Sequence, residues 1–248
     1  MKKILISVLF LLGTISMVSA EIGLKIGVSG SLGLYEATGT EKDTDSNTGM
    51  ASAVETNGNL AADDNLEAIG AMGSIFIEKT LKFLPGPLGR LSIGYDHVPH
   101  EIKTGTTSRS DKGLNGDLGA KSNQVGSLAA DRRDIINKAS ATIDNINTVY
   151  ATITITDWLY LKAGHMEADV TTTESLETGS TYGNLGIDGV MYGIGIQQQM
   201  DNGIFFRFEA NHTDLDGGKL TSQTNSDNVI ELNDITGDSA KFSIGKSF

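Results

Sequence analysis

The chain contains no cysteine, so a closed hydrogen-bonded wall or an apolar core must hold the fold without disulfides. Basic residues are also few: 19 Lys and Arg stand against 31 Asp and Glu, and the formal net charge is −12. Nucleic acid is therefore disfavoured as a partner, because phosphate binding needs clustered Lys and Arg. Beyond the first twenty residues no apolar run is long enough for a helical span, so a membrane crossing would have to be made by strands.

The first twenty residues have the parts of a secretory signal peptide. A basic start, Met1–Lys3, precedes the apolar run Ile4–Leu12, and the small residues of Val18–Ala20 predict cleavage before Glu21. The alternative, a permanent anchor, is disfavoured because the apolar run is short. We expect residues 1–20 to be removed and residues 21–248 to form one domain, since no Pro- or Ser-rich linker divides them.

Eight segments alternate apolar and polar residues with a period of two over lengths of about ten residues, which is typical of membrane barrel strands. In the fourth, Val149, Ala151 and Ile153 share one face, and the residues between them share the other. The segments are Ile22–Glu36, Glu67–Lys79, Arg90–His97, Thr148–Asp157, Leu159–Ala168, Gly189–Gln197, Ile204–His212 and Ala240–Phe248.

The connections between these segments are alternately long and short. The short ones are Thr80–Gly89, Asp157–Trp158 and Gln198–Gly203; the long ones are Ala37–Leu66, Val98–Asn147, Val170–Asp188 and Thr213–Ser239. An up-and-down barrel with both termini in the periplasm has this order, with the long loops outside the cell. The first and last long loops carry six acidic residues each against one lysine, so we expect them to be mobile and solvent-facing rather than packed.

The last segment, Ala240–Phe248, resembles the C-terminal β-signal of bacterial outer-membrane barrels, with Lys246 as a departure from an apolar position. Together with the export signal, it gives the chain a resemblance to the small OmpX-like, OmpW-like and opacity-type outer-membrane proteins. That resemblance implies an all-β, eight-stranded antiparallel up-and-down transmembrane β-barrel. The implied partners are outer-membrane lipid, lipopolysaccharide and the barrel assembly machinery, and we expect a monomer. A soluble lipocalin-like barrel, with its apolar face inside, is the alternative.

The polar faces of the segments are rich in Gly, Ser and Thr and also carry ions. An eight-stranded wall leaves an interior just wide enough for side chains, so we expect these ions to pair and to close the lumen. The predicted lumen network is Lys25, Glu78, Arg90, Asp96, Lys162, Arg207 and Glu209, with Lys241 beside it.

Histidines and aromatic residues are candidates for the membrane interfaces. His97, His165 and His212 share parity with the apolar face at the outer ends of strands, where they would form a polar cap or contact lipopolysaccharide phosphates. Aromatic residues gather near the short connections and predict an interfacial girdle. They are Phe83, Trp158, Phe205, Phe206 and Phe248.

The sequence predicts a structural, surface-interaction or limited small-solute permeation role. A lipid A-modifying enzyme and a narrow porin-like channel are the alternatives. We expect no enzyme, because His212 has no evident Ser partner, and no cofactor or metal, because the acidic run Asp43–Asn47 lacks the later residues of a calcium loop. Leu128–Ile146 has nearly helical apolar spacing and predicts a short helix in the second long loop.

Overall fold

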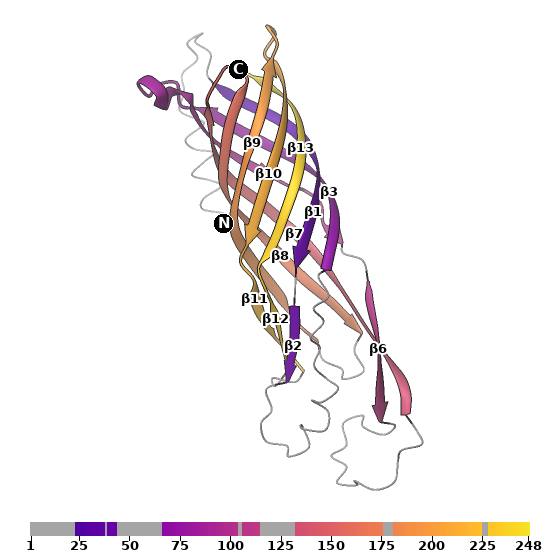
Figure 1. The fold of residues 1–248 in the computed structure, drawn as a ribbon. Helices are drawn as coiled ribbons and strands as arrows, with labels where there is room; N and C mark the ends of the chain where they lie inside the picture. The colour runs from indigo at the N-terminus through magenta and orange to yellow at the C-terminus, as the bar shows by residue number, and fades with distance from the viewer. Residues whose placement is uncertain are drawn as a thin grey trace.

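The computed structural model describes residues 23–37, 39–43, 66–103, 106–114, 132–175, 181–224 and 228–248, so the predicted signal peptide lies outside the described residues. Eight strands close into a barrel (Figure 1). They are β1 (Leu24–Ala37), β3 (Leu66–Thr80), β4 (Leu91–His97), β7 (Arg132–Thr154), β8 (Leu159–Ser175), β9 (Asn184–Gln199), β10 (Ile204–Leu215) and β13 (Ile235–Ser247). Among the described residues, no helical segment has the length and hydropathy needed to cross a bilayer.

Each barrel strand pairs antiparallel with the barrel strands before and after it in sequence, which is the up-and-down order expected from the alternating connections. β4 pairs with β7, and the first strand, β1, pairs with the last, β13, which closes the ring. Where β1 meets β13, the Gly23 N–H donates to the Phe248 carbonyl and the Phe248 N–H donates to the Leu24 carbonyl, each over 2.8 Å. The first and last strands therefore seal the wall to the last residue.

The two ends of the barrel differ. One, here the short-turn end, holds Gly23, Phe248, the turns at residues 155–158 and 200–203, and a ten-residue connection with the 3₁₀ helix η1 (Gly86–Arg90) (Figure 1). Gly203 has a φ of 83°, which only glycine adopts at little cost, and this backbone lets β9 return as β10. The opposite end, here the long-loop end, receives all the long connections.

The first and last long loops are more regular than the sequence predicts. β2 (Gly39–Asp43), β11 (Gly218–Thr221) and β12 (Asn228–Leu232) form a separate three-stranded antiparallel sheet beyond the barrel. The expectation that Ala37–Leu66 and Thr213–Ser239 would not pack was therefore wrong for these strands. Composition disfavours an apolar core there, but backbone ladders need none, and the Lys219–Glu231 ion pair adds to the sheet. Residues 44–65 and 225–227 lie outside the described residues.

The helix predicted at Leu128–Ile146 was also wrong, because β7 occupies residues 132–154. The register between β7 and β8 shifts between Asp144 and Asn147, where one extra residue forms a bulge and Asn145 has a φ of 50°. The bulge changes the parity of the strand, so Ile143 and Ile146 both pack in the apolar interior although they are three residues apart. This local spacing imitates that of a helix.

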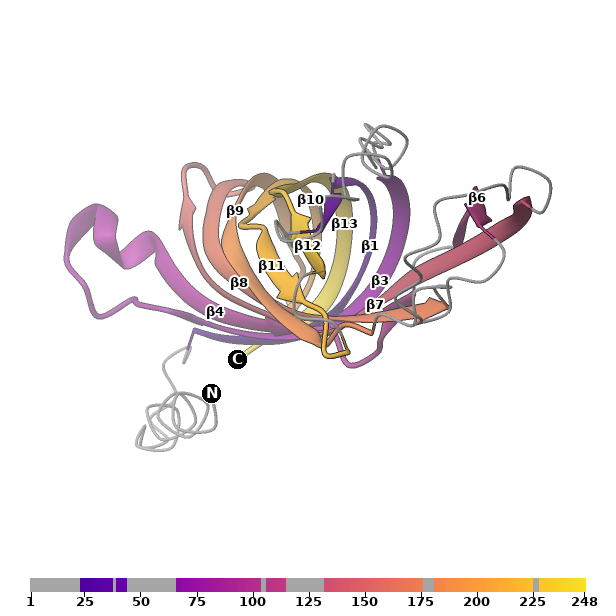
Figure 2. The ribbon, with the colours of Figure 1, turned by 90° about the horizontal axis from the view of Figure 1, so that it is seen from below.

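Two short strands continue the sheet along the outer part of β7. β5 (Ile102–Lys103) and β6 (Thr107–Leu114) both pair with it, and together with β7 and β8 they project beyond the barrel (Figure 2). By contrast, β3 pairs with β4 only from Ile75 to Thr80. Among the described strands, its residues 66–74 pair with β1 alone.

Candidate functional site

The barrel has its apolar side chains outside and its charged side chains inside. Glu78, Lys162, Arg207 and Glu209 are each at most 5% exposed. The outward positions of the same strands hold large apolar residues that are well exposed. They include Ile26, Val28, Leu32, Ile75, Ile93, Val149, Val190, Ile194, Ile196, Phe208, Phe242 and Ile244. A closed wall with an apolar exterior is the arrangement of a membrane-spanning barrel, whereas the soluble alternative would carry polar side chains outside.

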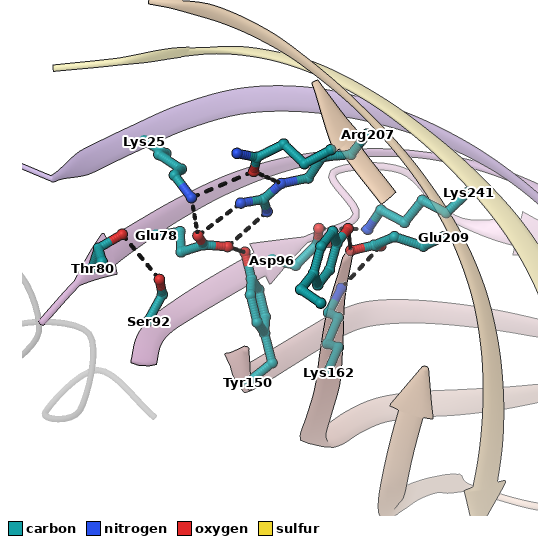
Figure 3. A network of polar contacts seen from close by, with 12 residues as sticks. Lys25, Glu78, Thr80, Ser92, Asp96, Tyr150, Lys162, Arg207, Glu209 and Lys241 are labelled. Atoms are coloured by element: carbon teal, nitrogen blue, oxygen red, sulfur yellow. Dashed lines mark hydrogen bonds and ion pairs between the residues drawn. The ribbon is translucent and has the colours of Figure 1, made fainter. Parts of the chain in front are cut away.

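Glu78 is the centre of the polar network near the short-turn end (Figure 3). Its two carboxylate oxygens each accept a 2.7 Å hydrogen bond from the guanidinium of Arg207, in a bidentate pair. Lys25 donates to the same carboxylate over 3.0 Å. Two cations from β1 and β10 therefore share one carboxylate from β3, and the group ties strands across the lumen.

Neighbouring side chains complete this arrangement. The amide oxygen of Gln197 accepts from Arg207 Nε over 2.8 Å. The guanidinium carbon of Arg207 lies 5.0 Å from the ring centre of Phe205, 5.2 Å from that of Tyr160 and 5.7 Å from that of Phe76. These rings surround the cation and fill the lumen beside it, so space for a water path is taken up by aromatic carbon.

A second ionic group lies next to the first. Lys162 donates to Glu209 over 3.2 Å, and the Tyr160 hydroxyl donates to the other oxygen of that carboxylate over 2.7 Å. Lys241 donates to Asp96 over 2.6 Å. Figure 3 shows the two pairs beside each other, and Lys162 Nζ is 4.3 Å from the centre of the Tyr150 ring. These two ionic groups together make up the lumen network.

Glycines on facing strands make room for the rings of the network. A side chain on Gly94 would overlap the ring of Tyr150, and one on Gly195 would overlap the ring of Tyr160. Each tyrosine therefore lies flat against a neighbouring strand that has no side chain at that point. The abundance of inward glycine in the sequence reflects these contacts.

Beyond the lumen network, toward the long-loop end, the interior changes character. An apolar cluster fills it, built from Val98, Ile146, Ala168, Val170, Ile187 and Leu215. A cavity of about 50 Å³ borders both regions and is lined by Met72, Met166 and Met191 as well as by Asp96 and Lys241. The lumen thus consists of an ionic half and an apolar half.

The structure brings together six of the seven residues predicted for the lumen network, but not Arg90. That side chain is exposed at the short-turn end, where its Nη1 donates to the Ile155 carbonyl over 3.1 Å. Arg90 ends η1 and precedes β4, so the inside–outside alternation of the strand does not extend to it. The prediction for Arg90 was therefore wrong.

The interface candidates lie on the exterior. At the long-loop end His212 Nδ1 is 2.7 Å from Asp238, and His165 Nε2 is 3.6 Å from Asp188. His97 Nδ1 is 2.9 Å from the Asn147 amide oxygen. At the short-turn end Trp158 is 55% exposed and Phe248 is 51% exposed. The histidines thus have polar neighbours at one rim, and the aromatic residues stand at the other.

The aromatic part of the lumen was missed from the sequence. Phe205 was expected in the interfacial girdle but is fully buried inside, and Tyr150, Tyr160 and Phe76 join it there. Their parity was the available signal, since all four alternate with outward apolar residues. Because a polar lumen was expected, these aromatic residues were not predicted to fill it.

No protein-family model and no curated protein matches the chain. Among solved structures it is similar to Ail, the attachment invasion locus protein of Yersinia pestis, at 9% identity and a TM-score of 0.39, covering 91% of this chain and 99% of that chain. It is also similar to the outer membrane protein OprG of Pseudomonas aeruginosa, at 8% identity and a TM-score of 0.41, covering 92% of this chain and 98% of that chain. A third similar structure is the outer membrane protease OmpT of Escherichia coli, at 10% identity and a TM-score of 0.41, covering 94% of this chain and 99% of that chain. The closed barrel itself is established by the strand ladders of this chain.

Proposed function

We propose that the protein is an integral outer-membrane barrel that does not conduct and that acts through the surface at its long-loop end. In this proposal residues 1–20 direct export, the assembly machinery inserts the barrel as a monomer, and the short-turn end faces the periplasm. Outer-membrane lipid and lipopolysaccharide surround the apolar exterior. The long-loop end then faces the outside of the cell.

The lumen network carries the proposal of a non-conducting barrel. Three carboxylates and four cations meet inside an eight-stranded wall, and aromatic rings pack around Arg207. Opening a path would separate buried charges that have no access to water, which is costly. This supports a closed wall rather than a diffusion pore.

The length of the strands supports a role at the surface. A membrane-spanning strand needs about 9–11 residues, whereas β7 has 23, β8 has 17 and β9 has 16. The residues of these strands beyond that length lie at the long-loop end, where β5 and β6 pair with β7 and extend the projecting sheet. Such a platform presents exposed strand edges and loop backbone to a partner outside the cell.

Two measurements test this proposal. In planar bilayers the refolded protein should give no conductance steps, and regular steps would overturn the closed lumen. Because the chain has no cysteine, Lys219→Cys and Asp201→Cys give background-free labelling with a membrane-impermeant maleimide. Lys219→Cys should react on intact cells and Asp201→Cys only after the outer membrane is opened; the reverse result would invert the orientation.

The geometry around His212 supports a non-enzymatic role. The adjacent hydroxyl, Thr213, is 3% exposed and points into the lumen, whereas His212 lies on the exterior, with its ring centre 5.1 Å from that of Tyr192 in a tilted contact. A base and a nucleophile must lie within hydrogen-bond reach, and here the wall separates them. Mass spectrometry of lipid A from cells with and without the protein should give identical spectra, and a protein-dependent mass change would reinstate the enzyme.

A second candidate function, limited passage of small apolar solutes, is favoured by the wall beside β3. Residues 66–74 have no ladder on the β4 side among the described strands, and the Gly73 N–H instead donates to His100 Nε2 over 2.9 Å. Met72, which packs against the apolar cluster, lies on this stretch. An apolar solute entering from the long-loop end would meet the apolar half of the lumen next to an incompletely paired wall.

This candidate is tested by closing the wall. A short thiol-reactive cross-linker between Gly73→Cys and His100→Cys should abolish protein-dependent influx of a small apolar solute into proteoliposomes if the gap is the route. The singly substituted proteins, treated in the same way, are the controls. Absence of influx in the untreated wild type would remove the candidate.

A further inference from the structure

The exterior of the barrel at the short-turn end is basic on one side. Lys79 ends the outward row of β3 and pairs in register with Leu24 of β1. Lys246 lies on β13 and pairs with Ile26 of the same strand β1. Lys82 follows β3 in the connection to η1. Three lysines therefore lie around the first residues of β1.

The stems of two of these lysines lie along the end of the wall. Lys82 Cδ is 3.7 Å from the position that a Cβ of Gly23 would take, and Lys246 Cε is 3.9 Å from that of Gly203. Lys246 begins on the outward, apolar face of β13, and its side chain extends toward Gly203 at the short-turn end. Its ammonium group therefore points toward the aqueous phase at that end. This is how lysine behaves at a membrane interface.

Apolar side chains complete the surface. Ile26 is 47% exposed directly beside Lys246, and Val28 is 53% exposed one step farther toward the centre. Phe83 and Leu88, in the connection that projects sideways from the barrel, are 77% and 54% exposed. Cations at the edge of an exposed apolar wall suit a ligand with an anionic head and an apolar tail.

The opposite rim has the other charge. There the histidines lie beside Asp188 and Asp238, and Glu167 is 3.7 Å from His165. At the short-turn end the acidic residues Asp157 and Asp201 are on the turns after β7 and β9, and Glu78 is buried in the lumen network. Charge complementarity therefore assigns an anionic ligand to the β13–β1–β3 side of the short-turn end.

We propose that Lys79, Lys82 and Lys246 bind the phosphate of an anionic phospholipid in the periplasmic leaflet, with its acyl chains on Ile26 and Val28. Lys79 and Lys246 are two strands apart and offset by two residues along β1, about 12 Å from strand spacing and rise, so their flexible stems reach one phosphate from both sides. The inference rests on the proposed membrane location and orientation. If the cysteine labelling supports that orientation but phosphatidylglycerol does not bind, the lipid site is rejected and the proposed function stands.

The test uses the whole barrel refolded in zwitterionic micelles. Dihexanoyl phosphatidylglycerol, dihexanoyl phosphatidylcholine and inorganic phosphate are titrated separately, and amide shifts of Gly23, Ile26 and Gly203 are followed by NMR. Phosphatidylglycerol should shift these amides saturably, and the other two should not. Equal shifts with phosphatidylcholine would overturn the anionic site, and equal shifts with inorganic phosphate would overturn a lipid as its occupant.

The variants locate the binding. A lysine near an anionic headgroup contributes about fivefold in affinity, so Lys79→Gln with Lys246→Gln should weaken phosphatidylglycerol binding by about 25-fold. Lys82→Gln alone should weaken it about fivefold. The matched control, Lys103→Gln with Lys219→Gln, removes two exposed cations at the long-loop end and should leave the affinity unchanged. Equal affinity in the double variant and this control would overturn the proposal.

Discussion

The two halves of the lumen solve the same packing problem in different ways. Near the short-turn end, charges are held by directional hydrogen bonds, and Glu78 alone binds two cations. Near the long-loop end, Val98, Ile146 and Leu215 pack without such bonds. Directional pairs allow one arrangement and are costly to break, whereas apolar contacts tolerate displacement. The ionic half therefore fixes the closed wall, and the apolar half is the part that can accommodate change.

The largest expected effect comes from the centre of the ionic half. Glu78→Gln leaves Arg207 and Lys25 buried without their carboxylate and should destabilise the barrel by about 3–5 kcal/mol. Urea titrations of the protein in lipid vesicles measure this. The control is Glu101→Gln, which removes an exposed pair with Lys103 and should leave the stability close to that of the wild type. Equal losses in the two variants would mean that the lumen network does not hold the fold.

The apolar half is tested by Leu215→Ala. Leu215 is 6% exposed in the apolar cluster. Its truncation should lower the free energy of unfolding by about 2–5 kcal/mol in the same titration. The loss is near the lower value if neighbouring side chains move into the vacated space. Leu215 and Arg207 are eight residues apart on β10, about 27 Å at strand rise. The Glu78→Gln and Leu215→Ala losses should therefore add within about 0.5 kcal/mol. A large departure from additivity would mean that the halves are coupled.

The exterior provides the next comparison. Val28→Arg places a cation deep in the apolar band and should cost about 2–4 kcal/mol. Ile155→Arg, at the turn after β7, reaches the interface and should cost about 0–1 kcal/mol. Both residues are exposed and apolar, at 53% and 45%, so depth is the variable that differs. Equal costs would contradict the placement of the membrane around the wall.

Glycine contacts in the ionic half predict a smaller effect. Gly94→Ala forces the buried Tyr150 ring to move and should destabilise by about 1–3 kcal/mol. Gly30→Ala is the matched control, because nothing lies within 4 Å of the position its Cβ would take. Refolding titrations should leave the control near the wild type. A similar loss in both would mean that the tyrosine contact is not the cause, since the effect of alanine on the unfolded chain alone would stabilise both variants.

The sequence predicts the barrel well because period-two alternation records which side of the wall each residue faces. It also predicts the ion pairs, since Lys25, Glu78 and Arg207 all have inward parity. It fails where parity is interrupted: the bulge at Asp144–Asn147 imitates a helix, and Arg90 precedes its strand. Alternation also carries no register, so pairing between distant loops, such as β2 with β12, could not be found from it.

The smallest expected effect separates exposed pairs from buried ones. A double-mutant cycle with His212→Gln and Asp238→Asn should give a coupling energy below about 1 kcal/mol, because both side chains are exposed. In about 1 M salt, where screening acts over roughly 3 Å, that coupling should vanish. The corresponding cycle for Lys162 and Glu209, both about 3% exposed, should keep its coupling, because salt cannot enter the lumen. Loss of both couplings in salt would mean that water and ions reach the network, and the closed lumen would then be untenable.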